Sequence, residues 1–249
     1  MKYCKRIVGG GYVGEITNYP FMATLWYLDG DEFKFKCGAT YIGKNFFLTA
    51  AHCIKNRNSN MTLIRMGSTY INGMPETMRV KKVYVHPHFN TTNLRNDIAI
   101  IEVEYSPKKY NPVRLPCNHL INVCYNIGSS VKVIGFGKDK DKSTQQFLEY
   151  MKEVDLKIKS LQETKYHSGI IGKDVFLAGD IKNGVVKDAC TGDSGGPCLM
   201  KIKNNWVLVG IVSWGSGCGK EKLPGVYTKV LSYNSWIRRI CKFPSCSNN

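Results

Sequence analysis

Short apolar runs alternate with polar turns along most of the chain. The runs are rich in β-branched and aromatic residues and are separated by Gly, Asn, Asp or Pro, a pattern typical of β-strands. Because such runs are many and helical patterns are few, the sequence predicts an all-β sandwich or barrel. The segments expected to form strands are Phe21–Tyr27, Phe46–Ala50, Val80–Val85, Ile98–Val103, Val131–Ile134 and Val207–Ser213.

Two other segments carry a pattern that a helix could produce. Glu153–Leu161, with apolar residues at positions 154, 156 and 158, is ambiguous. The C-terminal tail is clearer, because Asn234 is expected to cap a helix that has one apolar side and one cationic side. The apolar side comprises Trp236, Ile237, Ile240 and Cys241, and the cationic side comprises Arg238, Arg239 and Lys242.

The composition is that of a globular protein. With 249 residues, 43% of them hydrophobic and 22% charged, the chain has room for one large domain or two small ones and shows no sign of disorder. No apolar run approaches the roughly 20 residues that span a bilayer. We therefore expect a soluble protein without a membrane partner.

The cysteines indicate an oxidising compartment. There are ten, and no C-x-x-C pair of the kind that binds zinc is present, so disulfide bonds explain the number better. Two glycosylation sequons, which begin at Asn60 and Asn90, point the same way. We expect a secreted glycoprotein, and we interpret the lack of an apolar signal segment after Met1 as the mark of a processed form.

The chain is strongly basic, with a formal charge of +16 from 35 basic and 19 acidic residues. Such a charge attracts polyanions, whether nucleic acid, glycosaminoglycan or anionic lipid. A well-solvated basic surface explains the charge equally well. Among these partners we retain a heparin-like polyanion as a candidate and expect no nucleic acid.

The segment Gly192–Pro197 reads Gly-Asp-Ser-Gly-Gly-Pro and is the main candidate for chemistry. A serine hydroxyl such as that of Ser194 needs a base to become a nucleophile. The flanking glycines remove steric cover, so backbone amides can converge on one point and hold an oxyanion. The alternative, a Gly-rich turn without function, suits a shorter match better.

His52 is the best candidate for the base. It follows a predicted strand and stands beside Cys53, which is expected to anchor it. Asp97 leads into the apolar run Ile98–Val103, where a carboxylate must be satisfied by hydrogen bonds, and the imidazole of His52 is its natural partner. The remaining histidines, at positions 86, 88, 119 and 167, have no comparable motif.

These motifs together resemble the chymotrypsin/trypsin family of serine proteases, in the family's order of His, Asp and Ser. The matching segments are Ile7–Gly10, Leu48–Cys53, Asp97–Ala99, Gly192–Pro197 and Val212–Gly215. The resemblance implies two six-stranded antiparallel β-barrels followed by a C-terminal α-helix. We expect the first barrel at about residues 7–112, and the second barrel with the helix at about 113–249.

The resemblance also implies the catalytic roles. Ser194 would attack the carbonyl, His52 would act as general base and then as general acid, and Asp97 would hold the imidazole tautomer. The backbone amides of Gly192 and Ser194 would form the oxyanion hole. Ser213 would support Asp97.

The resemblance also implies the specificity, because in this family the residue six positions before the nucleophile forms the floor of the primary pocket. Asp188 would form the floor of the primary pocket, with Gly215 and Gly225 as its walls, which implies cleavage after Arg or Lys. Ala189 lacks a hydroxyl for a lysine ammonium, so Arg would be preferred. The segment Ser213, Trp214 and Gly215 would pair with the substrate backbone as an added strand.

The resemblance further implies activation by cleavage between Arg6 and Ile7. Residues 1–6 would then be the remnant of an activation peptide. The new ammonium of Ile7 would pair with Asp193 and order the oxyanion hole and the pocket, so that an uncut chain would be a zymogen.

Two disulfides would match those of the family, Cys37–Cys53 and Cys190–Cys218. Leucines at 161 and 177, and Val131 with Met200, stand where relatives have two further pairs. The six other cysteines, at positions 4, 117, 124, 198, 241 and 246, admit several pairings, and Cys198 is a candidate for a free core thiol. No metal or cofactor is expected, since Ser68 stands where the family's calcium loop begins with glutamate.

Two other functions remain in competition with an active protease. One is a catalytically weak homologue that serves as a binding or cofactor module, and the other is a polyanion-binding protein. For the latter, the cations of the terminal helix, joined by Lys157 and Lys159, would form a basic exosite. Expected partners of the protease are polypeptides with Arg or Lys at the cleavage site and protein protease inhibitors, and the chain is expected to be a monomer.

Overall fold

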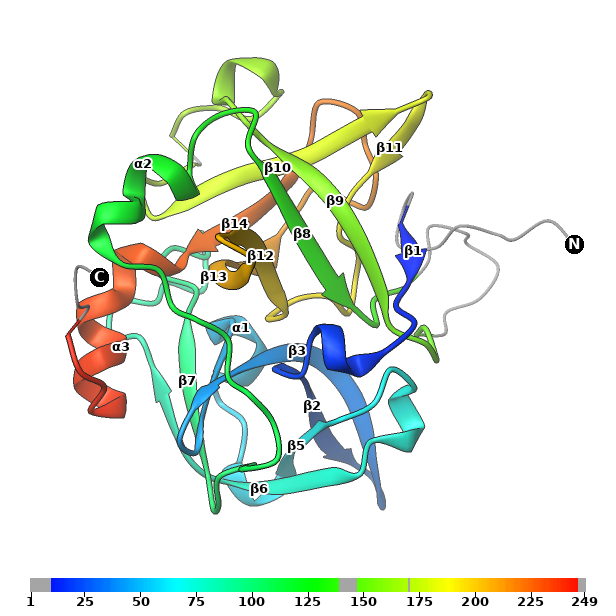
Figure 1. Ribbon diagram of the computed structural model, residues 1–249, viewed down its shortest axis with the longest axis vertical. Helices are drawn as coiled ribbons and strands as arrows, with labels where there is room; N and C mark the ends of the chain where they lie inside the picture. The colour runs from blue at the N-terminus through cyan, green and yellow to red at the C-terminus, as the bar shows by residue number, and fades with distance from the viewer. Residues whose placement is uncertain (1–9, 139–146, 170, 246–249) are drawn as a thin grey trace, which may run out of the picture.

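The computed structural model describes residues 10–138, 147–169 and 171–245. Two closed six-stranded antiparallel barrels lie one above the other, and the helix α3 (Asn234–Cys241) runs along one side of the lower barrel (Figure 1). The first half of the chain builds the lower barrel and the second half builds the upper one. The fold is therefore the one expected from the resemblance.

The first barrel closes in the order β2-β3-β4-β7-β6-β5. Each pair of neighbours is antiparallel, and β2 and β3 are joined by a tight turn at Gly30, whose φ of 68° suits glycine. Its strands are β2 (Met22–Asp29), β3 (Glu32–Gly43), β4 (Phe46–Thr49), β5 (Thr62–Met66), β6 (Glu76–Val85) and β7 (Ala99–Val103).

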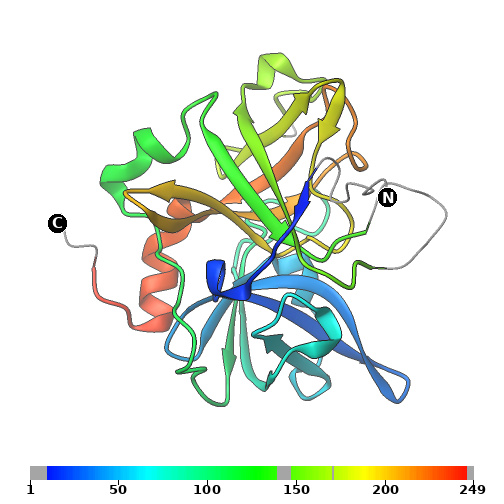
Figure 2. The same cartoon turned by 45° about the vertical axis from the view of Figure 1, so that its right-hand side comes forward.

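The second barrel runs β9-β8-β12-β13-β14-β10 and closes through the pairing of β10 with β9. The hairpin strand β11 and the short N-terminal strand β1 add to its edges, and Figure 2 shows β1 against this barrel although it precedes the first-barrel strands. The strands are β1 (Gly11–Tyr12), β8 (Ser130–Gly135), β9 (Lys152–Lys159), β10 (Val175–Lys182), β11 (Val185–Lys187), β12 (Pro197–Ile202), β13 (Asn205–Trp214) and β14 (Gly225–Lys229).

Helices are short in the described part of the chain. The α-helices are α1 (Ala51–Ile54), α2 (Ile121–Cys124) and α3, and the 3₁₀ turns are η1 (Ile16–Asn18), η2 (Ser59–Met61), η3 (Ile71–Gly73), η4 (Asn118–Leu120), η5 (Leu161–Glu163) and η6 (Val230–Tyr233). The expectation that Asn234 caps α3 is wrong. Tyr233 holds the cap position, and the Asn234 side chain instead donates to the Pro116 carbonyl at 2.5 Å.

The helix α3 leaves the second barrel and packs on the first. Its apolar side, including Trp236 and Ile237, belongs to the same buried cluster as the first-barrel strands. The Lys44 ammonium, from the turn after β3, donates to the carbonyls of Cys241 and Lys242 at 3.1 and 2.7 Å. A cation is favourable at a helix C-terminus, so this contact fastens the end of the chain to the first barrel.

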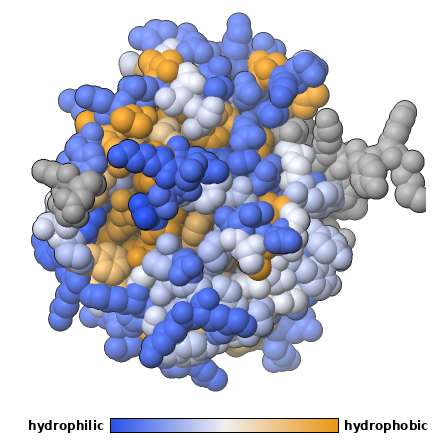
Figure 3. Space-filling model, in the orientation of Figure 1, coloured by the Kyte–Doolittle hydropathy of each residue, from blue (hydrophilic) through white to orange (hydrophobic). Residues whose placement is uncertain are grey.

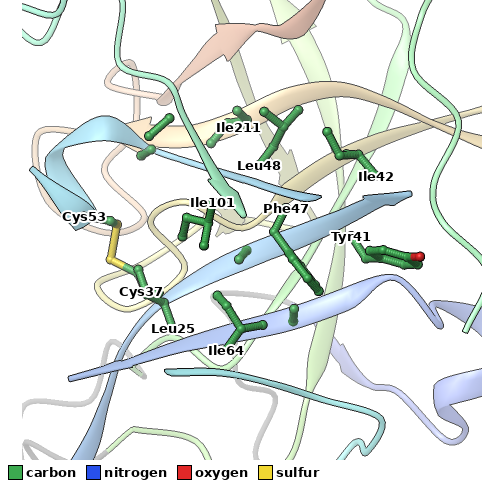
Figure 4. Close-up of a cluster of buried hydrophobic side chains, with 14 of the residues drawn as sticks. Leu25, Cys37, Tyr41, Ile42, Phe47, Leu48, Cys53, Ile64, Ile101 and Ile211 are labelled. Carbon is green, nitrogen blue, oxygen red and sulfur yellow. A yellow bond between two sulfur atoms is a disulfide. The ribbon is translucent and has the colours of Figure 1, made fainter. Parts of the chain in front are cut away.

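A closed hydrophobic core fills the first barrel (Figure 4). Leu25, Phe47, Ile64 and Ile101 come from different strands and point to one centre, and all are fully buried. The disulfide Cys37–Cys53 lies at the edge of this core and links β3 to α1 (Figure 4). The loop it closes has about 15 residues, a size that contributes roughly 3 kcal/mol in the chain-entropy model.

The second disulfide, Cys190–Cys218, is also present, and Cys117 is disulfide-bonded as well. Apolar packing replaces the family pairs that this chain lacks, because Val131 and Met200 are buried together in one cluster and Leu161 packs against Leu177 in another. Three of the cysteines that the structure describes are free and buried. They are Cys198, as expected from its apolar surroundings, and also Cys124 and Cys241.

All six expected strands are present within a few residues of their predicted ends. The ambiguous segment Glu153–Leu161 is a strand, because residues 154, 156 and 158 alternate into the core of the second barrel while residues 153, 155 and 157 face outward. The strands β1, β3, β5, β10, β11, β12 and β14 were not predicted. Charged residues interrupt the apolar pattern of β3 at its exposed end, and Gly179 and Asp180 interrupt that of β10.

Hydrophilic residues cover most of the face shown in Figure 3, with smaller hydrophobic areas between them. None of the helices in the described ranges is long and apolar enough to cross a membrane.

Candidate active site

The first barrel presents His52 on the short helix α1, directly after β4. The neighbouring Cys53 is tied to β3 by its disulfide, and its carbonyl accepts a hydrogen bond from the Tyr27 hydroxyl. The disulfide and this hydrogen bond together hold α1 against the strands of the first barrel. The His52 side chain is 28% exposed, so its imidazole is anchored at one end and open to solvent at the other.

Asp97 is fully buried and well supplied with donors. Its Oδ2 lies 2.7 Å from His52 Nδ1, and its Oδ1 accepts the His52 backbone N–H at 2.9 Å. Ser213 Oγ donates to Oδ2 at 2.5 Å, and Thr228 Oγ1 donates to the Asp97 carbonyl at 2.9 Å. Ser213 and Thr228 belong to β13 and β14, so the second barrel holds a carboxylate that the first barrel supplies.

A β-bulge in β13 directs Ser213 toward this carboxylate. The register between β13 and β14 shifts between Val212 and Trp214, which leaves Ser213 as the extra residue. Bulges re-aim side chains next to functional sites. The bulge therefore explains why a strand that pairs regularly elsewhere sends a hydroxyl into the interface between the barrels.

Two backbone contacts place Ser194, the first between the barrels and the second within the second barrel. The Gly38 N–H of β3 donates to the Ser194 carbonyl at 2.8 Å, and the Gly195 N–H donates to the Val212 carbonyl at 2.8 Å. A Cβ on Gly38 would lie 2.6 Å from the Gly196 Cα, and Gly195 has a φ of 78°. The close approach explains a glycine at position 38, and the left-handed backbone explains one at 195.

A single hollow of about 290 Å³ joins these groups. His52, Ser194 and Asp188 all line it, and Asp188 is buried, with 3% of its surface exposed. The other residues that the sequence assigned to the substrate pocket all line it as well, namely Ala189, Ser213, Trp214, Gly215 and Gly225. Gly192 and Asp193 are not among the lining residues and lie buried directly before Ser194.

Asp188 is a buried carboxylate with few partners. It is 3% exposed, the Gly219 N–H donates to its Oδ2 at 3.0 Å, and its Oδ1 has no hydrogen-bond partner among the described residues. Burial raises the pKa of Asp188 to about 7. A Cβ on Gly225 would lie 3.1 Å from Oδ1, so a larger residue there would crowd the free oxygen. The carboxylate suits a cationic ligand.

Asp193 is a second carboxylate of this kind. It is 1% exposed and accepts backbone N–H groups from Gly137 at 2.8 Å and Cys190 at 2.9 Å. Burial raises the pKa of Asp193 to about 6. The carboxylate lies where Cβ atoms on Gly135 and Gly137 would overlap it, so the two glycines make the space it occupies.

The family model described as Trypsin matches residues 8–237. The chain belongs to the trypsin family of serine proteases.

Relatives in this family cover nearly all of the chain. It is 33% identical to the tissue-type plasminogen activator of Sus scrofa over 94% of its length, and 33% identical to that of Mus musculus over 93%. It is 34% identical to complement factor I of Rattus norvegicus over 94% of its length. The chain spans 44% of either plasminogen activator and 38% of complement factor I, less than half of each relative.

Sequence reasoning missed several residues around the trypsin-family site. Leu94, with a φ of 51°, lines the hollow near His52. The ring of Tyr166 packs edge-on against Trp214 at a centroid distance of 5.4 Å. Thr191 also lines the hollow. Thr191 directly precedes the Gly192–Pro197 motif, so its place beside the site could have been read from the sequence. Only contacts between segments distant in sequence identify Leu94 and Tyr166.

A second hollow, of about 270 Å³, lies behind Asp188, which lines both. It is lined by parts of β10 and β11 and by the segment that contains Lys220 and Pro224. It contains none of the catalytic candidates. Asp188 therefore forms the wall between this hollow and the one that Ser194 lines.

Of the groups that could ligate a metal, the described residues contain the cluster Cys37, His52 and Cys53. The two sulfur atoms are bonded to each other in the disulfide, so neither is a thiolate that could bind a metal. Because the imidazole is also directed to Asp97, this cluster does not suit a metal ion. The sequon residues Asn60 and Asn90 are both exposed, on η2 and on the loop after β6. Arg6 and Ile7 lie outside the described residues.

Proposed function

We propose that the protein is a serine endopeptidase that cleaves polypeptides after Arg or Lys. The observation that carries this proposal is that Asp188, a buried carboxylate whose Oδ1 has no hydrogen-bond partner among the described residues, lines the same hollow as His52 and Ser194. A substrate with a long cationic side chain fills the hollow and brings its following peptide bond to Ser194. A guanidinium suits the carboxylate best, because it donates two parallel hydrogen bonds.

The proposed reaction follows from the contacts of His52. With its Nδ1 held by Asp97, the imidazole carries its free electron pair on Nε2. Nε2 takes the proton of the Ser194 hydroxyl while Oγ bonds to the scissile carbonyl carbon, and the carbonyl electrons move to oxygen. The N–H groups of Gly192 and Ser194 stabilise that oxyanion. His52 then protonates the leaving amine, and water releases the acyl group by the reverse sequence.

The substrate backbone is proposed to lie along the end of β13. Ser213, Trp214 and Gly215 border the hollow, and an extended peptide beside them can add a strand. Leu94, Trp214 and Tyr166 provide apolar surface near it. They favour an apolar residue in the part of the substrate that precedes the cleaved Arg or Lys.

Activation is proposed to follow cleavage between Arg6 and Ile7, which would free an ammonium at Ile7. The support is Asp193, whose buried carboxylate has only backbone donors, from Gly137 and Cys190, within the described residues. An ammonium paired with this carboxylate would offset the cost of its burial. It would also fix the peptide next to Gly192 and Ser194, which explains why the uncut chain is proposed to be a zymogen.

The test is hydrolysis of a small Arg ester and of a matched Phe ester by the chain cut after Arg6. We expect fast hydrolysis of the Arg ester, slow hydrolysis of the Phe ester, and loss of nearly all activity in Ser194→Ala. Failure of the cut chain to hydrolyse the Arg ester would favour a catalytically weak homologue. A preference for Phe would contradict the role of Asp188.

Polyanion binding is a second candidate, favoured by two adjoining hollows beside α3. One, of about 500 Å³, is lined by His86, Trp236 and Arg239. The other, of about 260 Å³, shares Ser232 with it and is lined by two lysines at positions 173 and 229. No carboxylate lines either hollow within the described residues.

This placement changes which cations carry the exosite. Arg238 donates to the Pro244 carbonyl, whereas Lys157 and Lys159 lie on β9 and contact Ser130 and Glu163. Arg239→Glu should therefore lower the salt needed to elute the protein from heparin. Lys108→Glu, outside both hollows, is the matched control. Equal shifts in the two variants would show that only net charge matters.

The remaining partners and the location are proposals of the same kind. A secreted protease fits the disulfides between Cys37 and Cys53 and between Cys190 and Cys218. The exposed sequon residues Asn60 and Asn90 are accessible to glycosylation. A rigid protein inhibitor that presents Arg or Lys in an extended loop would occupy the same hollow as a substrate.

A further inference from the structure

Three consecutive residues after β8 hold the segment that precedes Ser194. The Phe136 carbonyl accepts the Leu148 N–H at 3.2 Å, the Gly137 N–H donates to Asp193 Oδ1 at 2.8 Å, and the Lys138 N–H donates to the Thr191 carbonyl at 2.6 Å. One short stretch of backbone therefore touches both sides of Gly192. It also touches the chain that returns at Phe147 and Leu148.

The Lys138 contact sets the direction of the Gly192 N–H. In a trans peptide the carbonyl and the N–H point in opposite directions. Because the Thr191 carbonyl is directed to the Lys138 backbone, the N–H of the same peptide unit, that of Gly192, is directed away from Lys138. Gly192 has a φ of 99°, a left-handed conformation that glycine adopts readily. The peptide could otherwise rotate, since glycine has no side chain to restrain it.

The ring of Phe147 occupies the position where a side chain on Gly192 would be. A Cβ on Gly192 would lie 2.7 Å from Phe147 Cε1 and 2.9 Å from Cδ1. The ring thus covers the Gly192 backbone on the face that glycine leaves bare. Packing against this face limits rotation of the peptide, which is the restraint that glycine itself does not provide.

The ring of Phe147 is itself held in place. It packs edge-on against Phe35 of β3, with a centroid distance of 4.9 Å and an interplanar angle of 80°, an arrangement that aromatic pairs favour. The Lys138 ammonium lies 5.2 Å from the centroid of the Phe147 ring. Phe35, Lys138 and Phe147 thus form one side-chain cluster. Phe35 belongs to the first barrel, so the cluster joins both barrels around Gly192.

We propose that Phe147 is a positioning residue for the oxyanion site: its ring, held by Phe35 and Lys138, keeps the Gly192 peptide in the orientation that stabilises the tetrahedral intermediate. This inference rests on the proposed function. Phe147 is not among the residues that line the hollow with Asp188. Loss of the ring should therefore weaken binding of the transition state and leave recognition of the cationic side chain intact.

The test compares Phe147→Ala with a matched variant far from Gly192. Phe243 packs edge-on against Phe46 at 6.3 Å and has the Lys44 ammonium 5.3 Å from its ring centroid, so Phe243→Ala removes the same kind of contacts elsewhere. Phe147→Tyr keeps the ring and should restore function. Each variant is assayed in the form in which the wild-type chain is active.

Three measurements separate the possible roles. The first is kcat/KM on an Arg p-nitroanilide, which has no residue after the cleaved bond. The second is affinity for a peptidyl argininal, whose aldehyde carbon bonds to Ser194 Oγ while the hydroxyl proton passes to His52 and the aldehyde oxygen becomes an oxyanion. The third is affinity for benzamidine, a cation that fills the Asp188 hollow and forms no oxyanion.

Phe147→Ala should lower kcat about 10- to 100-fold, somewhat less than removal of a whole oxyanion donor, which costs about 10²- to 10³-fold. Argininal affinity should fall by a similar factor and benzamidine affinity by less than about twofold. Phe147→Tyr and Phe243→Ala should stay near the wild type in all three measurements.

Two results would overturn the proposal. Unchanged kcat and argininal affinity, with losses only on peptides that continue beyond the cleaved bond, would make Phe147 a contact for the leaving segment. An equal loss of benzamidine affinity would show that the whole loop around Asp188 had collapsed. Failure of the proposed function looks different, because the wild-type chain itself would neither hydrolyse the p-nitroanilide nor bind the argininal.

Discussion

The two sides of the candidate site differ in how their buried carboxylates are compensated. On the side of the first barrel, Asp97 receives hydrogen bonds from His52 and from Ser213 of the second barrel. On the side of the second barrel, Asp188 and Asp193 have only backbone donors among the described residues, and burial raises their pKa values to about 7 and about 6.

The folded chain therefore compensates one buried carboxylate by itself and leaves the charges of the other two to be compensated by a cation. Asp97 is satisfied inside the folded chain, so the pair with His52 is formed before any substrate arrives. The other two carboxylates bear a desolvation cost that only a cation removes. For Asp188 we propose that the cation is the substrate side chain, and for Asp193 that it is the ammonium of Ile7.

The largest loss of activity is expected on substitution of Asp97, the carboxylate that the folded chain already compensates. Asp97→Asn should lower kcat about 10⁴-fold, because an amide in this place favours the wrong tautomer of His52. KM should change little, since the hollow is not altered. Steady-state kinetics on an Arg ester measures both. Asp31→Asn, an exposed aspartate, is the control, and a loss below tenfold at Asp97 would mean that this carboxylate does not orient the base.

The second largest loss of activity is expected on substitution of Asp188, the proposed floor of the substrate pocket. Asp188→Ser should lower kcat/KM for Arg and Lys substrates about 10²- to 10⁴-fold, the range for a buried charge left unpaired. Hydrolysis of a Phe ester should not fall. Asp180→Ser is the matched control, because Asp180 lines only the hollow behind Asp188. If Asp188→Ser kept the preference for Arg, the floor of the pocket would lie elsewhere.

Activation tests the second open carboxylate. Arg6→Gln should stay uncut by trypsin and should hydrolyse Arg esters at a small fraction of the activated rate, because no ammonium reaches Asp193. Lys5→Gln keeps Arg6 and should be activated normally. The measurement is ester hydrolysis before and after trypsin, with the cut followed by N-terminal sequencing. Full activity in uncut Arg6→Gln would refute the mechanism.

A smaller effect follows from the raised pKa of Asp188. Only the ionised carboxylate binds a cation, so benzamidine affinity should fall as the pH drops through about 7, approaching tenfold per pH unit. Isothermal titration between pH 5.5 and 8.5 measures this. His52→Ala should keep the dependence, because it originates in Asp188. A flat profile in both proteins would mean that Asp188 is ionised throughout this range.

The smallest effect concerns stability of the uncut chain. The pKa of Asp193 is about 6 in the folded protein and about 4 when unfolded, so the folded state binds the proton more tightly. The contribution of Asp193 to the free energy of unfolding is therefore greatest at low pH and falls as pH rises from about 4 through about 6, by about 3 kcal/mol.

Thermal unfolding of Arg6→Gln at pH 4.5 and 7 measures this loss. The double variant that also carries Asp193→Asn should show less of it, since an amide does not ionise. An equal loss in the two proteins would assign the pH dependence to other groups.

The sequence alone determined the chemistry more fully than the architecture. Six strands, the family motifs and the candidates His52, Asp97 and Ser194 could be read from local patterns, because spacing and residue type carry that information. Asp188 followed from the resemblance to the family. In the folded chain His52, Asp188 and Ser194 line one hollow. The strand β9 could not be separated from a helix, since three apolar residues two positions apart suit both until a neighbouring strand fixes the register.

Only the tertiary structure decided the contacts between segments that are distant along the chain. The bulge that turns Ser213 toward Asp97, the use of Asn234 to bind Pro116 and the ring of Phe147 over Gly192 leave no mark in a local pattern. Each depends on how the two barrels close on one another. The residue types of the site are local in the sequence, whereas their orientation and the pKa values of their carboxylates arise from burial, which exists only in the folded chain.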